Sequence, residues 1–509
     1  MSSDESLSVC VLILMTLAGG AVAVIVARRL HRVLSFRVFA IAFYMTVNVV
    51  SGIAHILDTS RIRRGYFDAV ASLDPGQLSE TSLIEALGLI AICFGVLRGL
   101  PRRGTATPPE SKSLAPSDRA LLIPAIAVLL PASLWSLLKI QAYASTLDSV
   151  RIISVSGGMA RYAFLSSWFV SAIYFVVIWI ASRLPHNRRL LVPLILFVGV
   201  VLISASVQWT GSRGSAVFLC LPLILVLAPT LKNVKGPAVA FGAAIGLVST
   251  VVVLRANDLR QSRSAFGSTG LSDWVDWELG RFSMLGFALQ SADRYGLLYG
   301  ETFVNSAAKP LASLSGFLGI ELFQSSGRSS VDLAAAQLLN SSKADYIVPG
   351  LSAELFLNFG TVGLVLGYFV LGRVCSWTDD RFINSGSLVT QLAWAFVGVE
   401  IVRSIAYGGA AIMTILFTGA PLLAVAGVSH LIHRSHLDTA ATRADVGRYT
   451  GTRGSDRVMS KRYSPSGGRT RCGPASQGAP ANTAKEPTAM TAIAKLTSRH
   501  GADRPMRSD

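Results

Sequence analysis

Long apolar stretches alternate with short polar segments along most of the chain, and eleven of these stretches are long enough to cross a bilayer. A transmembrane helix needs about 20 predominantly apolar residues, and most of the stretches have no charged residue near their middle. They cover residues 9–27, 36–57, 82–100, 120–138, 162–182, 190–207, 214–231, 236–254, 351–373, 385–403 and 409–428. The pattern predicts an all-α, polytopic membrane protein with about 11 transmembrane helices, eight within residues 1–254 and three within residues 351–428. The first stretch is too long for a signal peptide and lacks a small-residue cleavage site, so it is predicted to be a span.

The composition agrees with this pattern. Of the 509 residues, 51% are hydrophobic and only 15% are charged, and the mean hydropathy is +0.51. Soluble domains carry roughly 25% charged residues, so a soluble enzyme and a disordered protein are both excluded for most of the length. Five cysteines are too few for a disulfide framework.

The positive charges indicate an orientation. The short segments between the predicted spans lie alternately on the two sides of the membrane. If the N-terminus is outside, the inner segments hold 16 Lys and Arg residues and the outer segments hold 8. Because short cytoplasmic loops carry the excess of Lys and Arg, the N-terminus is predicted to lie outside and the C-terminus in the cytoplasm. The net charge of +17 therefore belongs mainly to inner loops and to the C-terminal tail, and it does not indicate a nucleic-acid-binding protein.

Two segments lie outside the apolar pattern. Residues 429–509 are rich in Ser, Thr, Gly, Pro and Arg, which predicts a disordered basic cytoplasmic tail. This tail either contacts anionic lipid or a partner, or is simply solvated. Residues 255–350 form a large outer loop with 8 basic and 9 acidic residues and many aromatic ones, and we expect short interfacial helices there. Its aromatic rings either bind sugars or anchor the loop at the headgroup level.

Charged residues gather at the predicted outer ends of the spans. They are Arg213, Arg255, Arg260, Arg263, Glu354, Glu400 and Arg403. Placing an ionisable side chain in or near a membrane costs free energy, so such residues are first considered as functional. Guanidinium groups bind phosphate oxygens and keep their charge, so the pattern suits transfer from a pyrophosphate-linked donor. Glu354 is the candidate base, and Asn358 lies four residues further on the same helix face.

Simpler interpretations apply to the same residues. Glu400 and Arg403 are spaced as an i,i+3 ion pair, and arginines at span ends can extend toward headgroups. Glu85 is also predicted near an outer end, where it belongs to no motif. His55 is predicted to be a packed or interfacial histidine.

Two segments and the overall layout resemble the Wzy-type O-antigen polymerases, also called oligosaccharide repeat-unit polymerases. The segments are GLSAELFLNFGTVGLVLGYFVLG at 350–372, which follows the large loop, and TGSRG at 210–214, which leads into a span. The likeness covers residues 190–430. It implies a GT-C-like fold in a bacterial inner membrane, and a reaction that joins oligosaccharide units carried on undecaprenyl pyrophosphate at the outer face.

The resemblance also implies roles for individual residues. Arg213, Glu354 and Asn358 match by motif, and Glu354 and Arg213 are the predicted catalytic residues. The remaining residues of the predicted pyrophosphate and sugar site are placed by position: Arg255, Arg260, Arg263, Arg281, Arg403, Trp274 and Trp277. The loop lacks the arginine-to-glycine spacing that some family members show. A chain-length regulator protein and membrane lipid are the further partners implied.

No metal and no cofactor is expected, because the adjacent pair Asp379 and Asp380 falls on the predicted inner side. Three other functions stay open. A ligase would transfer finished glycan to another acceptor through a similar site. A transporter or flippase for lipid-linked sugar would bind its substrate near the bilayer midplane, often with broken helices, whereas the predicted midplanes here are nearly free of charge. A non-catalytic scaffold would leave the outer arginines unexplained.

Overall fold

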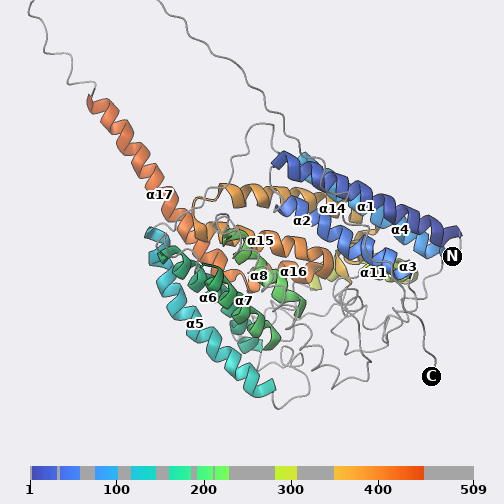
Figure 1. Ribbon diagram of the computed structural model, residues 1–509, viewed down its shortest axis with the longest axis horizontal. Coiled ribbons are helices and arrows are strands. Elements are labelled where there is room, and N and C mark those ends of the chain that lie inside the picture. The colour runs from blue at the N-terminus through green and yellow to red at the C-terminus, as the bar shows by residue number, and fades with distance from the viewer. Residues whose placement is uncertain are drawn as a thin grey trace, which may run out of the picture. The chain divides into compact units, whose positions relative to one another are not determined.

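The computed structural model describes nine parts of the chain: residues 3–30, 35–57, 75–100, 116–144, 160–184, 192–209, 213–227, 281–305 and 349–451. Within these parts every regular element is a helix (Figure 1), and seven helices are long and apolar enough to cross a membrane. The prediction of an all-α protein with membrane-spanning helices is therefore confirmed. The total of eleven spans and the GT-C-like fold stay predictions, and the span expected at 236–254 lies outside the described residues.

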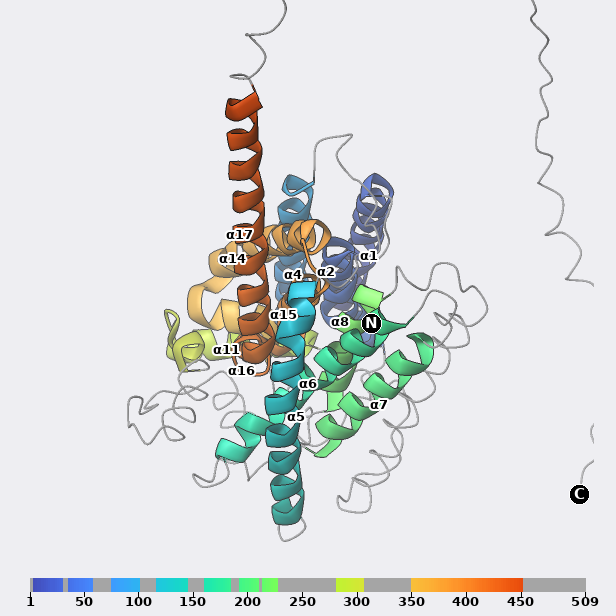
Figure 2. The ribbon, with the colours of Figure 1, turned by 90° about the vertical axis from the view of Figure 1, so that its left-hand side faces the viewer.

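The helices of the N-terminal half follow the predicted spans. They are α1 (Ser3–Leu30), α2 (Phe36–Tyr44), the π-helix η1 (Met45–Val50), α3 (Ser51–Leu57), α4 (Pro75–Arg98), α5 (Pro116–Ala144), α6 (Ala160–Arg183), α7 (Val192–Trp209) and α8 (Arg213–Leu227). Helices α2, η1 and α3 continue one another without a gap. Helices α5, α6 and α7 pack together (Figures 1 and 2), and α8 joins them through α7. The predicted spans 190–207 and 214–231 contain only the shorter apolar helical segments Leu194–Ser204 and Val217–Leu227.

The C-terminal half contributes the centre of the bundle. Its helices are α11 (Phe282–Tyr295), α14 (Gly350–Asn384), α15 (Leu388–Tyr407), α16 (Gly409–Phe417) and α17 (Ala420–Gly451). Helix α14 packs most extensively on α4 and α15. Helix α11 was expected on the membrane surface, but it packs against α14 and α4. Its apolar residues are buried around most of the helix: Phe282, Met284, Leu285, Phe287, Ala288 and Leu289.

Helix α14 consists of two arms that fold back on each other. Gly360 has φ 64° and ψ −162°, a conformation that is essentially restricted to glycine. The hydroxyls of Ser352 and Tyr368 are 2.7 Å apart, whereas 16 residues of straight helix would separate them by about 24 Å. The predicted span at 351–373 is thus a short first arm, 350–359, and a longer second arm, 361–384.

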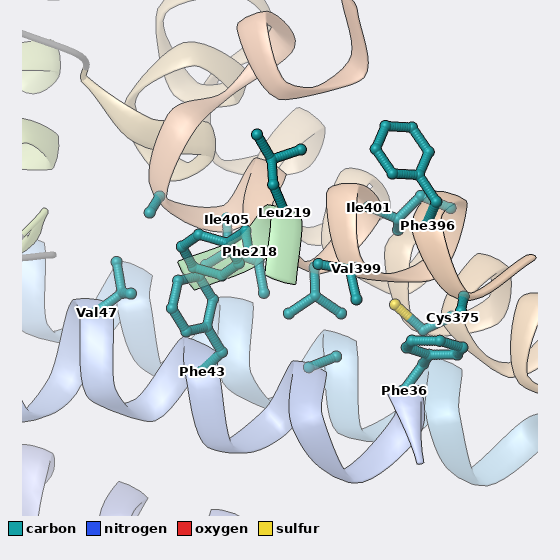
Figure 3. Packing of buried hydrophobic residues seen from close by; sticks show 14 of the residues in the cluster. Phe36, Phe43, Val47, Phe218, Leu219, Cys375, Phe396, Val399, Ile401 and Ile405 are labelled. Atoms are coloured by element: carbon teal, nitrogen blue, oxygen red, sulfur yellow. The ribbon is translucent and has the colours of Figure 1, made fainter. Parts of the chain in front are cut away.

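The buried hydrophobic cluster includes residues from most of the described helices, and one part of it lies where α2 and η1 meet α8 and α15. Figure 3 shows Phe43 and Val47 facing Phe218 of α8 and Ile405 of α15. The rings of Phe43 and Phe218 are 5.3 Å apart and nearly perpendicular, which is a favourable aromatic geometry. Helix α15 is buried along most of its length, so its position is fixed by packing on several sides.

Ion pairs fix one end of the bundle. Arg37 at the start of α2 is fully buried and donates to Asp379 at 2.9 Å and to Asp380 at 2.7 Å on α14. It also donates to the main-chain carbonyls of Gly99, at 2.9 Å, and Ser376, at 3.1 Å. We call these five residues the Arg37 cluster. It joins α2, the end of α4 and the end of α14, which the topology prediction placed on one side of the membrane.

The C-terminal region differs from the prediction in two ways. The span expected at 409–428 is interrupted at Thr418 and Gly419, so that α16 ends and α17 begins within it. Helix α17 also continues to Gly451, past the predicted start of a disordered tail at 429. Ser429 is buried and donates to Asp118 of α5 at 2.5 Å, so packing extends the helix beyond the apolar stretch. Residues 452–509 lie outside the described part of the chain.

Candidate functional site

The turn between α15 and α16 brings predicted site residues together. Tyr407 ends α15, and Gly408 has φ 58° and ψ −147°, which lets the chain turn sharply into α16 at Gly409. A Cβ atom at Gly408 would collide with the carboxylate of Glu354. Gly408 and Gly409 form a glycine pair, and Gly408 is needed both for the close approach of α14 and for the turn itself.

Glu354 lies on the first arm of α14 and is buried. Its Oε2 atom accepts the main-chain N–H of Gly409 at 2.6 Å, and its Oε1 atom accepts the hydroxyl of Thr302 at 3.3 Å. The carboxylate thus sits at the N-terminus of α16, where the helix dipole favours a negative charge. This placement gives the buried carboxylate a favourable electrostatic environment.

Arg403 lies one turn before the end of α15. Its guanidinium pairs with Glu400 at 2.9 Å, so the simple interpretation of these two residues as an i,i+3 ion pair describes the geometry. The same guanidinium lies over the ring of Tyr407, with 4.6 Å from Cζ to the ring centroid, and over the ring of Phe218 at 5.9 Å. Both rings present their faces to the cation.

Arg281 reaches the same turn from the start of α11. Its Nε atom donates to the carbonyl of Ala406 at 2.8 Å, and its guanidinium lies 5.8 Å from the Tyr407 ring centroid. Its aliphatic carbons pack on Gly350 at the start of α14. We call Arg281, Glu354, Arg403, Tyr407 and the glycine pair the Tyr407 cluster. It combines α11, the first arm of α14, and the α15–α16 turn.

Asn358 lies one turn after Glu354 and joins the first arm to residues 297–305. Its Oδ1 atom accepts the N–H of Gly300 at 2.9 Å and of Thr302 at 3.4 Å, and its Nδ2 atom donates to Thr302 Oγ1 and to the Glu354 carbonyl, both at 2.6 Å. All four contacts are to the protein. The geometry makes Asn358 a positioning residue for Thr302 and Glu354, and its predicted role as a substrate ligand stays a prediction.

The other predicted residues are placed only in part. Arg213 is the first residue of α8, which also carries Phe218; its side chain lies outside the described part. Arg255, Arg260, Arg263, Trp274 and Trp277 lie wholly outside the described residues. His55 is in α3, and its side chain is not described. The structure therefore brings together Arg281, Glu354 and Arg403, with Asn358 beside them.

Sequence reasoning missed several residues of this region. Tyr407 and Thr302 were not singled out, although the Tyr-Gly-Gly run between the predicted spans 385–403 and 409–428 was a signal for a tight turn. Glu85 was expected near an outer end, but α4 begins at Pro75, seven residues before the predicted stretch. Glu85 consequently lies near the middle of the candidate span Gly76–Arg98 and is fully buried.

Comparisons with known proteins add no assignment. No protein-family model matches the chain, and no match was found among curated proteins or among solved structures. Among the described residues, no group of three or more His, Cys, Asp and Glu side chains could hold a metal ion. The structure thus defines the class, a helical membrane protein with several apolar helices long enough to span a membrane, and the activity is a matter for proposal.

Proposed function

We propose that this protein is a glycosyltransferase that polymerises oligosaccharide repeat units carried on undecaprenyl pyrophosphate, at the outer face of the bacterial inner membrane. The observation that carries the proposal is the Tyr407 cluster. Arg281, Glu354 and Arg403 are 122 residues apart in the chain from first to last, yet all three side chains contact the α15–α16 segment between Arg403 and Gly409. Two guanidiniums and a carboxylate at one helix junction suit a pyrophosphate donor and a hydroxyl acceptor.

The reaction would proceed by attack of a sugar hydroxyl on the anomeric carbon of the growing, lipid-linked chain. A new carbon–oxygen bond forms as the bond from that carbon to the pyrophosphate oxygen breaks. Glu354 accepts the hydroxyl proton or orients the acceptor. Arg281 and Arg403, with Arg213 and Arg255, hold the departing pyrophosphate and stabilise the charge that develops on it. Guanidiniums can do this without a metal ion.

An exposed tyrosine beside Asn358 suits contact with the sugars. Tyr299 is 81% exposed, and its main-chain N–H donates to the carbonyl of Asn358 at 3.0 Å. Tyr299 also has φ 47°, a conformation that costs free energy for a non-glycine residue. A strained, exposed ring beside a polar cluster suits a stacking platform for a sugar ring.

The test is reconstitution with a lipid-linked repeat unit and separation of the products by length. Arg403→Ala and Glu354→Gln should each lower polymer formation by at least 100-fold, on the scale seen for loss of one transition-state contact, about 10²–10³ in rate. Arg294→Ala is the matched control, because Arg294 is an exposed arginine on α11. If both test variants form polymer of wild-type amount and length, the site assignment is refuted.

The lipid-linked products separate polymerase from ligase. A polymerase lengthens the glycan on undecaprenyl pyrophosphate, whereas a ligase moves it to a different acceptor. The same reaction tests the metal-free mechanism. A chelator should leave the distribution of polymer lengths unchanged, and loss of the polymer in its presence would contradict this part of the proposal.

A transporter for lipid-linked sugar is the second candidate. Two observations favour it: the break in α14 at Gly360 and the buried Glu85 near the middle of α4. Broken helices and midplane carboxylates are typical of secondary transporters. Movement of a labelled lipid-linked unit across vesicles, without any lengthening of its glycan, would favour this function over polymerisation.

A further inference from the structure

A buried polar network lies between α2, η1, α4 and α14, and it shares no residue with the Tyr407 cluster. Its members are Tyr44, Asn48, Glu85, Ser352 and Tyr368, and each is at most 1% exposed. We call these five residues the Glu85 network. Asn48 belongs to the π-helix η1, an irregularity that is frequent at functional sites. Ser352 belongs to the first arm of α14 and Tyr368 to the second, so the network spans the fold-back of this helix.

The hydrogen bonds around Glu85 require more hydrogens than its neighbours supply. The Tyr44 hydroxyl contacts both the main-chain carbonyl of Glu85, at 2.9 Å, and its Oε2 atom. One hydroxyl has a single hydrogen and can donate to only one of these oxygens. A proton on Oε2 supplies the missing hydrogen. The carboxylic acid then donates to the Tyr44 hydroxyl, and the Tyr44 hydroxyl donates to the main-chain carbonyl of Glu85.

Among the described residues, no cation pairs with Glu85. Its contacts among the described residues are Tyr44 and Ser352, and its Oε1 atom has no hydrogen-bond partner there. The titratable group that α14 contributes to the network is Tyr368. The polar residue from η1 is Asn48, an amide that does not titrate. The charged residues of the neighbouring helices α1 and α11 lie at the helix starts or are exposed: Asp4, Glu5, Arg28, Arg29, Arg281, Asp293 and Arg294. None of these seven has an ion pair or hydrogen bond with Glu85 in the part of the chain that the structure describes.

We propose that Glu85 is a proton-binding site, and that its protonated form holds the first arm of α14 in place. An ionised carboxylate buried without a cation carries a large desolvation cost, whereas a neutral acid does not. The proton comes from water and returns to water, and no bond other than the O–H bond forms or breaks. As pH rises and the proton leaves, the unpaired carboxylate favours a state in which water reaches it.

The proton would act on the arm through Ser352. The hydroxyl of Ser352 lies 3.2 Å from Glu85 Oε2, 2.7 Å from the Tyr368 hydroxyl, and accepts from Asn48 Nδ2 at 3.3 Å. Glu354 is two residues further along the same arm. Loss of the proton therefore loosens the segment that also places Glu354 at the start of α16. This inference concerns the arm itself and stands whether the Tyr407 cluster catalyses polymerisation or not.

Infrared spectroscopy tests the protonation directly. At neutral pH the difference spectrum between wild type and Glu85→Gln should contain the C=O stretch of one protonated carboxylic acid that the variant lacks. Glu80→Gln is the control, because Glu80 is an exposed carboxylate on the same helix, and it should remove carboxylate bands instead. Loss of carboxylate bands from the Glu85→Gln protein would overturn the proposal.

Hydrogen exchange of residues 350–359 tests the coupling and uses the wild-type chain, so it does not depend on how a variant folds. The exchange rate is measured from neutral to alkaline pH relative to α15, whose amides report the intrinsic pH effect. Release of one proton changes the opening equilibrium about tenfold per pH unit above the midpoint, so the ratio should rise by that factor. Glu85→Gln, an isosteric mimic of the neutral acid, should keep the ratio constant across this pH range.

Two results would overturn the proposal. One is a ratio that stays constant with pH in the wild type. The other is a ratio that responds to added sodium at fixed pH, since that result assigns the site to a metal cation.

Discussion

The two ends of α14 both hold buried arginines, but in different ways. At one end Arg37 donates to two carboxylates and two main-chain carbonyls. At the other end Arg403 pairs with Glu400, and Arg281 donates to the main-chain carbonyl of Ala406. In addition, both guanidiniums lie over the ring of Tyr407, Arg403 also lies over Phe218, and a glycine pair forms the adjoining turn. A guanidinium surrounded by anionic and carbonyl oxygens fixes three helices. Guanidiniums on ring faces beside a tight turn suit a site that exchanges partners, so the first end is a structural element and the second is the candidate for chemistry.

The largest expected effect is on stability at the Arg37 end. Arg37→Ala leaves Asp379 buried without its cation, and removal of one partner from a buried ion pair costs about 3–5 kcal/mol. Thermal unfolding in detergent should show a large fall in midpoint. Arg98→Ala, which changes an exposed arginine at the same end, should have little effect. Equal stability of the two variants would break the comparison.

The same end depends on a close approach of two backbones. A Cβ atom at Gly372 of α14 would lie 2.5 Å from the carbonyl oxygen of Ile92 on α4, so Gly372→Ala must separate the helices. Overpacking of this kind costs about 1–3 kcal/mol, and the unfolding midpoint should fall accordingly. Gly76→Ala on α4 meets no atom within 4 Å and should keep the wild-type midpoint.

The fold-back at Gly360 is the next test. An alanine there would be held at φ 64° and ψ −162°, at a cost of about 1–3 kcal/mol. We expect faster hydrogen exchange in residues 350–359 together with lower polymer formation, while the Arg37 end keeps its protection. Gly427→Ala, where the added Cβ meets no atom within 4 Å, is the control. Normal exchange in the Gly360→Ala protein would argue against a strained hinge.

The smallest effect is expected at the ring itself. Tyr407→Leu removes the surface beneath two guanidiniums, and each cation–π contact contributes about 0.5–1 kcal/mol. Stability should change little, whereas polymer formation should fall several-fold because Arg281 and Arg403 lose their orientation. Tyr407→Phe keeps the ring face and should retain activity. If Tyr407→Leu lowers stability but not polymer formation, the Tyr407 cluster has a structural role like that of the Arg37 cluster.

Much of the helical framework could be predicted from the sequence, because about 20 apolar residues in a row leave the backbone few alternatives in a membrane. Seven of the predicted stretches correspond to helices long enough to span. The breaks were harder to predict. Gly360 lies in a glycine-rich apolar run whose hydropathy is the same for a straight helix and for two packed arms.

The site was predictable in its residue types and less so in its contacts. Glu354 and Arg403 were singled out because charge at a span end is costly, and this reasoning holds for any fold. Arg281 was placed only by its position in the predicted outer loop. Tyr407 and Thr302 could not be found in the same way, since an aromatic or a hydroxyl at a span end is common. Glu85 was misplaced because the polar first turns of α4, PGQLSET, contribute nothing to an apolar pattern yet extend the helix by two turns.

The four hydrogen bonds of Asn358 have a consequence for how this protein can vary. Leu298 and Tyr299 also donate their main-chain N–H groups to the last carbonyls of the first arm, at 2.9 and 3.0 Å. Residues 297–305 and 350–359 therefore complete each other's backbone bonding, although more than forty residues separate them in the chain. The two segments form one structural unit. A chimera that exchanges both together should fold, and one that exchanges either alone should not.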